Sequence, residues 1–164
     1  MAVILVEGVT DRIALEAVAA KLGLDLAAEE VEIVPIGGAQ AIRRAFSQYE
    51  GRRVAGLCDA AEERWFRRVL GDATYVCVVD LEDELIRALG APRVEEVLAA
   101  HADLRTFRTF QNQPAWRGRP AEAQLRRWFQ ASDQRAIRYP PLLIGQLEPD
   151  ELPPPLTGVL AAVA

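Results

Sequence analysis

Acidic side chains follow several short apolar runs in this sequence, in a pattern that could hold a divalent metal ion. The candidate ligands, in chain order, are Glu7, Asp11, Asp59, Asp80, Glu82 and Glu84. Carboxylates that share a small volume repel one another unless a proton or a cation neutralises them. Mg²⁺ and Mn²⁺ are hard cations that prefer oxygen ligands. The pattern therefore predicts a Mg²⁺ or Mn²⁺ site, although an acid in the first turn of a helix is also ordinary complementation of the helix dipole.

The elements around these acids predict an α/β fold. Short β-branched runs alternate with stretches of helical period. The expected strands are residues 3–6, 31–36, 54–57 and 75–79, and the expected helices are about 11–22, 39–49, 60–70 and 82–89. Strands that are apolar throughout are buried on both faces, which predicts a mainly parallel four-stranded sheet with helices on both sides. The functional crevice of such a sheet lies beyond the carboxyl ends of its strands.

Turn and cap residues support this arrangement. Thr10 is placed to cap the first helix and Gly23 to end it. Gly37 and Gly38 precede the second helix, where free backbone N–H groups could accept a phosphate of a nucleic acid, or where the chain simply makes a tight turn. Asp11 on the first helical turn can reach back toward Glu7, so that two acids face one volume.

The order of the motifs resembles the Toprim domain of topoisomerases, primases and several nucleases, and most closely that of the OLD (overcoming lysogenisation defect) nucleases. VEGVTD matches the E-G-x-[ST]-D motif, PIGGAQAI matches the glycine turn after the second strand, and DLEDELI matches the closing acidic segment. The resemblance covers about residues 2–90. It implies a Toprim-like, Rossmann-like fold and a divalent-metal-dependent nuclease that cleaves phosphodiester bonds. Glu7 would be a ligand or general base, Asp11 and Asp59 would be ligands, and Asp80, Glu82 and Glu84 would complete the site.

Two departures from the family pattern leave a second function open. Toprim proteins place D-x-D after the third strand, but here the third position is Ala61, and we expect the following Glu62 and Glu63 to face solvent. OLD-type nucleases place a lysine beyond the acidic segment, whereas Lys21 is the only lysine of this chain. The alternative is a catalytically impaired Toprim module that binds nucleic acid or regulates an ATPase partner. A metal-dependent phosphatase or receiver-like phosphoacceptor that uses Asp59 is a third reading.

Charge is distributed unevenly along the chain. Residues 1–103 carry a net charge of −8, whereas residues 104–145 carry eight Arg against two acids, or +6. Arg108, Arg117 and Arg119 alternate with aromatic residues, which predicts contacts with phosphates and bases, or equally the core of a small helical cap. We expect residues 1–100 to form the Toprim-like core and residues 101–164 to form an Arg-rich helical extension packed on it, within the same domain.

The remaining features concern partners and location. Pro140-Pro141 predicts a helix break, and ELPPPL near the C-terminus predicts an extended strap. The first apolar run is too short for a signal peptide or a membrane span, which predicts a cytoplasmic protein with no membrane partner. The expected partner is nucleic acid, DNA rather than RNA. No Walker motif is present, so any ATPase would be a separate subunit.

Overall fold

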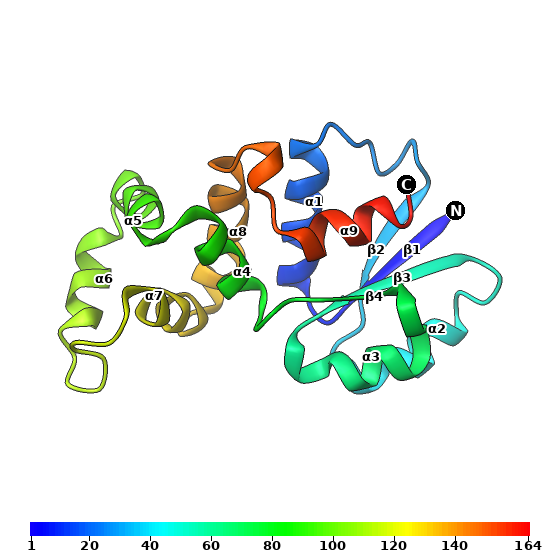
Figure 1. Cartoon of the computed structure of the whole chain (residues 1–164), viewed down its shortest axis with the longest axis horizontal. Helices are drawn as coiled ribbons and strands as arrows, with labels where there is room; N and C mark the ends of the chain where they lie inside the picture. Colours follow the sequence, from blue (N-terminus) through cyan, green and yellow to red (C-terminus); the bar gives the residue numbers. More distant parts are fainter.

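The computed structural model describes all residues from 1 to 164 and contains one four-stranded parallel sheet. The strands are β1 (Ala2–Val6), β2 (Val31–Pro35), β3 (Arg53–Cys58) and β4 (Thr74–Val76), in the spatial order β2-β1-β3-β4 (Figure 1). Val6 at the end of β1 pairs with Pro35 on one side and with Leu57 on the other. The predicted parallel sheet is therefore confirmed, and the carboxyl ends of its strands form a single edge.

Helices cover both faces of this sheet, as predicted. Residues of β1 alternate between the two faces, with Ile4 in the larger hydrophobic cluster and Leu5 in the smaller one. The larger cluster includes residues of α1 (Val9–Lys21) and α9 (Pro154–Ala161), and the smaller one lies against α2 (Ile42–Ser47) and α3 (Glu63–Leu70). Every residue of β1 is apolar and buried, because both faces of the sheet are covered at this strand.

The helix ends differ in detail from those predicted. Helix α1 begins at Val9, with Gly8 as its N-cap, so Thr10 lies inside the first turn and does not cap it. The helix does end before Gly23, whose φ of +71° is the left-handed conformation that glycine tolerates. Four short 3₁₀ turns connect the elements, namely η1 (Ala39–Ala41), η2 (Ala60–Glu62), η3 (Gly71–Ala73) and η4 (Pro149–Glu151).

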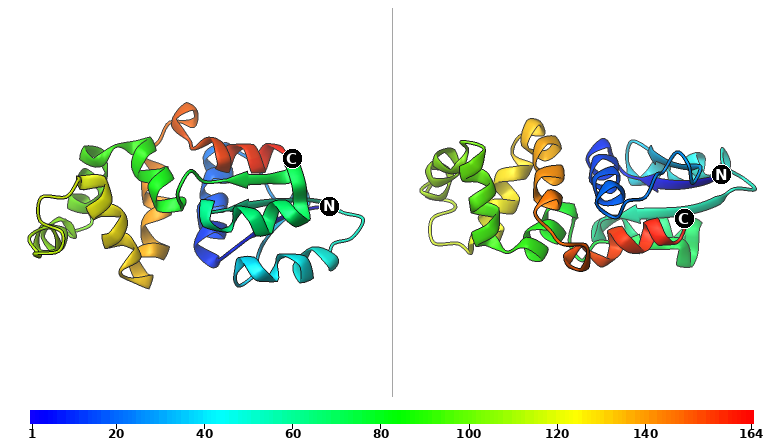
Figure 2. Two further views of the ribbon diagram at one scale, coloured as in Figure 1. Left: turned by 60° about the horizontal axis from the view of Figure 1, so that its bottom comes forward. Right: turned by 90° about the horizontal axis from the view of Figure 1, so that it is seen from above.

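After β4 the chain leaves the sheet and forms a helical part beside it. This part consists of α4 (Leu81–Leu89), α5 (Ala91–Ala100), α6 (Leu104–Gln111), α7 (Ala121–Gln130) and α8 (Asp133–Gly145) (Figure 2). Trp128 packs edge-on against Phe107 and Tyr139, with ring centroids 5.7 and 5.8 Å apart. These buried rings belong to the same hydrophobic cluster as α1 and the sheet, so the core is continuous between the two parts.

The two proline-rich segments are helical, which corrects both predictions made for them. Helix α8 continues through Pro140 and Pro141 up to Gly145. Each proline removes one helical N–H donor, but Tyr139 and Pro140 are buried in the core, and this packing holds the helix together. The segment after Pro153 forms helix α9, with prolines in its first turn, where their missing N–H groups cost nothing. Helix α9 returns to the sheet and packs on β3 and β4.

None of the helices combines the length and the apolar character needed to cross a bilayer.

Candidate metal centre

The centre of the candidate site is a pair of carboxylates at the ends of adjacent strands. Glu7 directly follows β1 and Asp59 directly follows β3, and these strands are hydrogen-bonded neighbours. Because parallel strands end at one edge, the fold brings the two side chains together without any contact between their loops. A carboxylate oxygen from each of Glu7, Asp59 and Glu62 lies within 4.8 Å of the others.

Glu62 is the member of this cluster that the sequence reading placed in solvent, and the structure corrects that reading. Residues 60–62 form the 3₁₀ turn η2, with Asp59 at its N-cap. A 3₁₀ helix has three residues per turn, so positions i and i+3 eclipse each other. Glu62 therefore lies on the same side of the turn as Asp59. The spacing D-x-x-E after a strand was the signal for this, and it supplies a third acid although Ala61 replaces the usual one.

Asp11 and Glu82 extend the cluster on its other side. Together with Glu7 and Asp59 they line a cavity of about 260 Å³, which also borders Gln130. One carboxylate oxygen of Asp11 accepts a hydrogen bond of 2.9 Å from the N–H of Gly8, which fixes its direction at the start of α1. Asp11 thus both caps the helix and faces the cavity, and the sequence alone could not decide between these two roles.

The electrostatics of the site disfavour four charged carboxylates. Burial, and then the neighbouring acids Asp11, Asp80, Glu82 and Glu7, raise the pKa of Asp59 to about 8. Burial, and then the charges of Glu7 and Glu82, raise the pKa of Asp11 to about 6, against the opposing effect of the Gly8 hydrogen bond. The pKa values of Glu7 and Glu82 are raised as well, chiefly by burial.

The residues that line the cavity fit a divalent cation. Four carboxylates surround the cavity, and neither a lysine nor an arginine lies among its lining residues. A hard cation with oxygen ligands would offset the repulsion that the raised pKa values express. The donor set therefore suits Mg²⁺ or Mn²⁺ better than a softer ion, because neither of the buried thiols, Cys58 and Cys77, lines the cavity.

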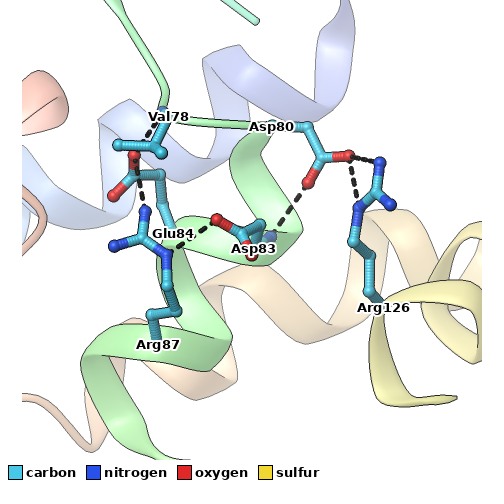
Figure 3. Close-up of polar contacts among 6 residues, drawn as sticks. All are labelled: Val78, Asp80, Asp83, Glu84, Arg87 and Arg126. Carbon is cyan, nitrogen blue, oxygen red and sulfur yellow. Dashed lines mark hydrogen bonds and ion pairs between the residues drawn. The ribbon is translucent and has the colours of Figure 1, made fainter. Parts of the chain in front are cut away.

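The three acids expected to bind metal at the start of α4, Asp80, Glu82 and Glu84, contact different partners. Asp80 is the N-cap of α4, and one of its oxygens accepts a bond of 2.9 Å from the N–H of Asp83. Its other oxygen accepts a bond from Arg126 Nε at 2.7 Å (Figure 3). The same oxygen accepts a bond from Gln130 Nε2 at 2.9 Å. Both carboxylate oxygens of Asp80 thus accept hydrogen bonds from other groups of the protein. The sequence had predicted Asp80 to be a metal ligand.

Glu84 is engaged in a different direction. Its carboxylate accepts a bond of 2.7 Å from the backbone N–H of Val78 and forms an ion pair of 3.1 Å with Arg87 (Figure 3). The side chain is 4% exposed. It therefore fixes the loop between β4 and α4, and it does not line the cavity. Of the three acids expected from this segment, the structure brings Glu82 alone to the cavity.

The glycine turn after β2 lies next to the cluster, in a neighbouring hollow of about 440 Å³ that Glu7, Glu62 and Trp65 also line. The N–H groups of Gly37 and Gly38 both donate to the carbonyl of Glu7, at 3.0 and 3.3 Å. These two donors are therefore used to hold the end of β1. A side chain at either position would meet open space, so the glycines are explained by their positive φ angles of +78° and +117°.

The three arginines expected to contact nucleic acid lie in the helical part, and none of them lines the acidic cavity. Arg108 forms an ion pair with Glu95 and contacts Gln111. Arg117 donates to the carbonyl of Asn112, and the guanidinium of Arg119 lies 5.0 Å from the centroid of the Trp116 ring. Lys21, the only lysine, donates to the carbonyl of Gly145 at 2.9 Å, at the far end of α1 from Asp11.

Comparisons with known proteins agree with this architecture. Residues 1–59 match the family model described as overcoming lysogenization defect protein-like, TOPRIM domain. The fold is similar to that of the C-terminal region of the Burkholderia pseudomallei OLD protein, with a TM-score of 0.73 at 15% identity over 99% of this chain and 96% of that chain.

The C-terminal region of the Xanthomonas campestris pv. campestris OLD protein gives a TM-score of 0.70 at 18% identity, over 99% of this chain and 93% of that chain. No curated protein sequence is similar enough to this chain to count as a match. Residues 1–59 are therefore similar to an OLD-like Toprim domain, and the chain has, over nearly its whole length, the fold of the C-terminal region of OLD proteins.

Proposed function

We propose that this protein is a divalent-metal-dependent nuclease that hydrolyses phosphodiester bonds of nucleic acid. The observation that carries the proposal is the cluster of Glu7, Asp59 and Glu62, whose oxygens lie within 4.8 Å of one another at the carboxyl edge of the sheet. A cation bound among these carboxylates would offset their mutual repulsion. The match to an OLD-like Toprim domain points to the same chemistry.

The proposed roles follow from the position of each side chain. Glu7, Asp59 and Glu62 would hold the cation, with Asp11 and Glu82 completing the cavity. A bound Mg²⁺ or Mn²⁺ would lower the pKa of an attacking water and offset charge on the leaving oxygen. Glu7, whose pKa is raised by burial and by the charge of Glu62, is the candidate to accept a proton from that water. Gln130 donates to Asp80 and Glu82 and so orients the latter toward the cavity.

A second function, a binding module without cleavage, is favoured by one observation. No lysine or arginine side chain lines the acidic cavity, and the only lysine is bonded to the carbonyl of Gly145. A cationic side chain that stabilises the leaving group is therefore missing from the lining. Such a module would bind metal and nucleic acid but leave the phosphodiester intact.

A cleavage assay separates these two functions. Single-stranded DNA, duplex DNA and RNA would each be incubated with Mg²⁺, with Mn²⁺ and with EDTA. We expect metal-dependent cleavage, with rates lowered at least ~100-fold in Glu7→Gln and Glu62→Gln. Asp72→Asn, an exposed acid in η3 beyond the opposite end of the strands, is the matched control and should retain the wild-type rate. Metal-induced stabilisation without cleavage of any substrate would refute the nuclease and favour the binding module.

A further inference from the structure

A further hollow, outside the acidic site, lies in the helical part between α6, α7 and the start of α8. We call it the arginine groove, because Arg105, Arg127 and Arg135 line it. Its volume is about 550 Å³, and the remaining polar side chains of its lining are two threonines and a glutamine. No acidic residue lines it.

The charge in this groove is not balanced by the protein. Of the eight arginines between residues 104 and 145, Arg108, Arg126 and Arg138 form ion pairs with carboxylates, and the other five do not. All three groove arginines belong to the unpaired group. Arg105 and Arg127 are exposed. Three guanidinium groups that face one hollow repel each other, and a polyanion that enters it would relieve this repulsion.

One wall of the groove is aromatic and held in place. Trp116 is half-buried and stacks on Phe110, with ring centroids 5.4 Å apart and an interplanar angle of 30°. The buried side chain of Gln124 donates to the carbonyl of Trp116 at 2.8 Å and accepts from Gln111 at the same distance. The loop that carries Trp116 is thus fixed to α7. A base can stack on this partly exposed indole in place of the Arg119 guanidinium, which lies 5.0 Å from the centroid of the ring.

The groove and the acidic site share helix α7. Arg126 and Gln130 of this helix contact Asp80 beside the acidic cavity, whereas Arg127 lines the groove. Arg135 lines the groove and also a small hollow that Glu82 lines. The groove and the acidic cavity therefore border the same helix, at Arg127 and Gln130 respectively.

We propose that the arginine groove binds a single-stranded segment of nucleic acid, with phosphates at Arg105, Arg127 and Arg135 and a base stacked on Trp116. Arg135 is oriented for this by its own contacts, because it donates to the Trp128 carbonyl and its guanidinium lies 4.0 Å from the centroid of that ring. A duplex keeps its bases stacked inside and could use the arginines but not the indole. The inference rests on the proposed function for the identity of the polyanion.

Binding measured in EDTA tests the groove without any cleavage. The probe is a fluorescently labelled single-stranded oligonucleotide, followed by anisotropy at several salt concentrations. Arg105→Gln combined with Arg127→Gln should weaken binding about tenfold or more and lower the slope of log K against log salt by roughly 1.4, or ~0.7 for each lost phosphate contact. Trp116→Leu should weaken binding at least about fivefold and leave the slope unchanged.

The matched control removes two exposed arginines from the opposite end of the sheet. Arg52 precedes β3, and Arg68 lies near the C-terminal end of α3. Their double change to Gln should leave both the affinity and the slope close to wild type. An equal loss of affinity in the control and groove variants would mean that binding depends only on the overall charge of the protein, and it would overturn the proposal.

Further outcomes separate this inference from the proposed function. If the groove variants keep the wild-type affinity and slope, the proposal that the groove binds nucleic acid is overturned. Metal-dependent cleavage by the same variants would still support the proposed nuclease activity. A groove effect on binding, together with no cleavage in Mg²⁺ or Mn²⁺, would support the groove and refute the nuclease. Tighter binding of duplex than of single strand, or displacement of the oligonucleotide by poly-glutamate at equal charge, would overturn the assignment of the ligand.

Discussion

Replacement of Asp59 by Asn should stabilise the metal-free protein at high pH and abolish its response to metal. The pKa of Asp59 is raised from 3.8 to about 8, first by burial and then by the surrounding acids. The folded state therefore binds a proton that the unfolded state has already lost. The free energy of unfolding contributed by this group is complete below about pH 4 and falls as the pH rises toward about 8.

The magnitude follows from the size of that shift. Four pKa units correspond to at most about 6 kcal/mol, at ~1.4 kcal/mol per unit. The four acids share the repulsion, so loss of one charge relieves only part of it, and we expect a gain of roughly 2–3 kcal/mol for Asp59→Asn at about pH 8. For a domain of this size, that is an increase in Tm of roughly 5–10 °C. At about pH 3 the two proteins should be equally stable, because Asp59 is then protonated in both states.

Thermal unfolding followed by circular dichroism, in EDTA and in saturating Mn²⁺, measures both effects. Mn²⁺ at about 100 times its Kd should stabilise the wild type by ~2.7 kcal/mol. It should have little effect on Asp59→Asn or on Glu7→Gln. Asp72→Asn provides the control for loss of an exposed acid. A stability difference between wild type and Asp59→Asn that is the same at both pH values, or equal Mn²⁺ shifts in the two proteins, would refute the reasoning.

Three other changes test the packing and the ligand set. Gly56→Ala should lower the free energy of unfolding in urea by about 1–3 kcal/mol, because its Cβ would come within 2.5 Å of a leucine carbon on α3; an unchanged midpoint would contradict this packing. Arg126→Ala should cost about 1–3 kcal/mol in the same assay, since it removes a partner of the buried Asp80, whereas Arg127→Ala should cost little. Ala61→Asp should leave the Mg²⁺ dependence of cleavage unchanged, because Glu62 already supplies the third carboxylate; a clear gain would show that a ligand is missing.

The sequence predicted the parts of the site that depend on strand order. Glu7 and Asp59 each follow an apolar run, and parallel strands end at one edge whatever the loops do. The position of Glu62 depends on the turn after β3, and the D-x-x-E spacing that indicates it was overlooked because only the D-x-D pattern was considered. The sequence also gave no indication of the partners of Asp80, since Arg126 lies 46 residues further along the chain.

Helix α8 illustrates a related limit. Two adjacent prolines indicate a break when only the local backbone is considered. The buried side chains around Pro140, which belong to the core, stabilise the helix enough to offset the two lost hydrogen bonds. Local signals therefore predicted where elements lie, but tertiary packing determined which of them continue.

The return of α9 to the sheet makes the helical part an insertion rather than a tail. The chain leaves the sheet after β4 and comes back at α9, which packs on β3 and β4 (Figure 1). A protease that cuts the exposed loop between α6 and α7, near Gly118, would therefore leave two fragments that each contribute to the same core. The nicked molecule should stay associated and unfold cooperatively, whereas a chain shortened before α9 would expose one face of its sheet.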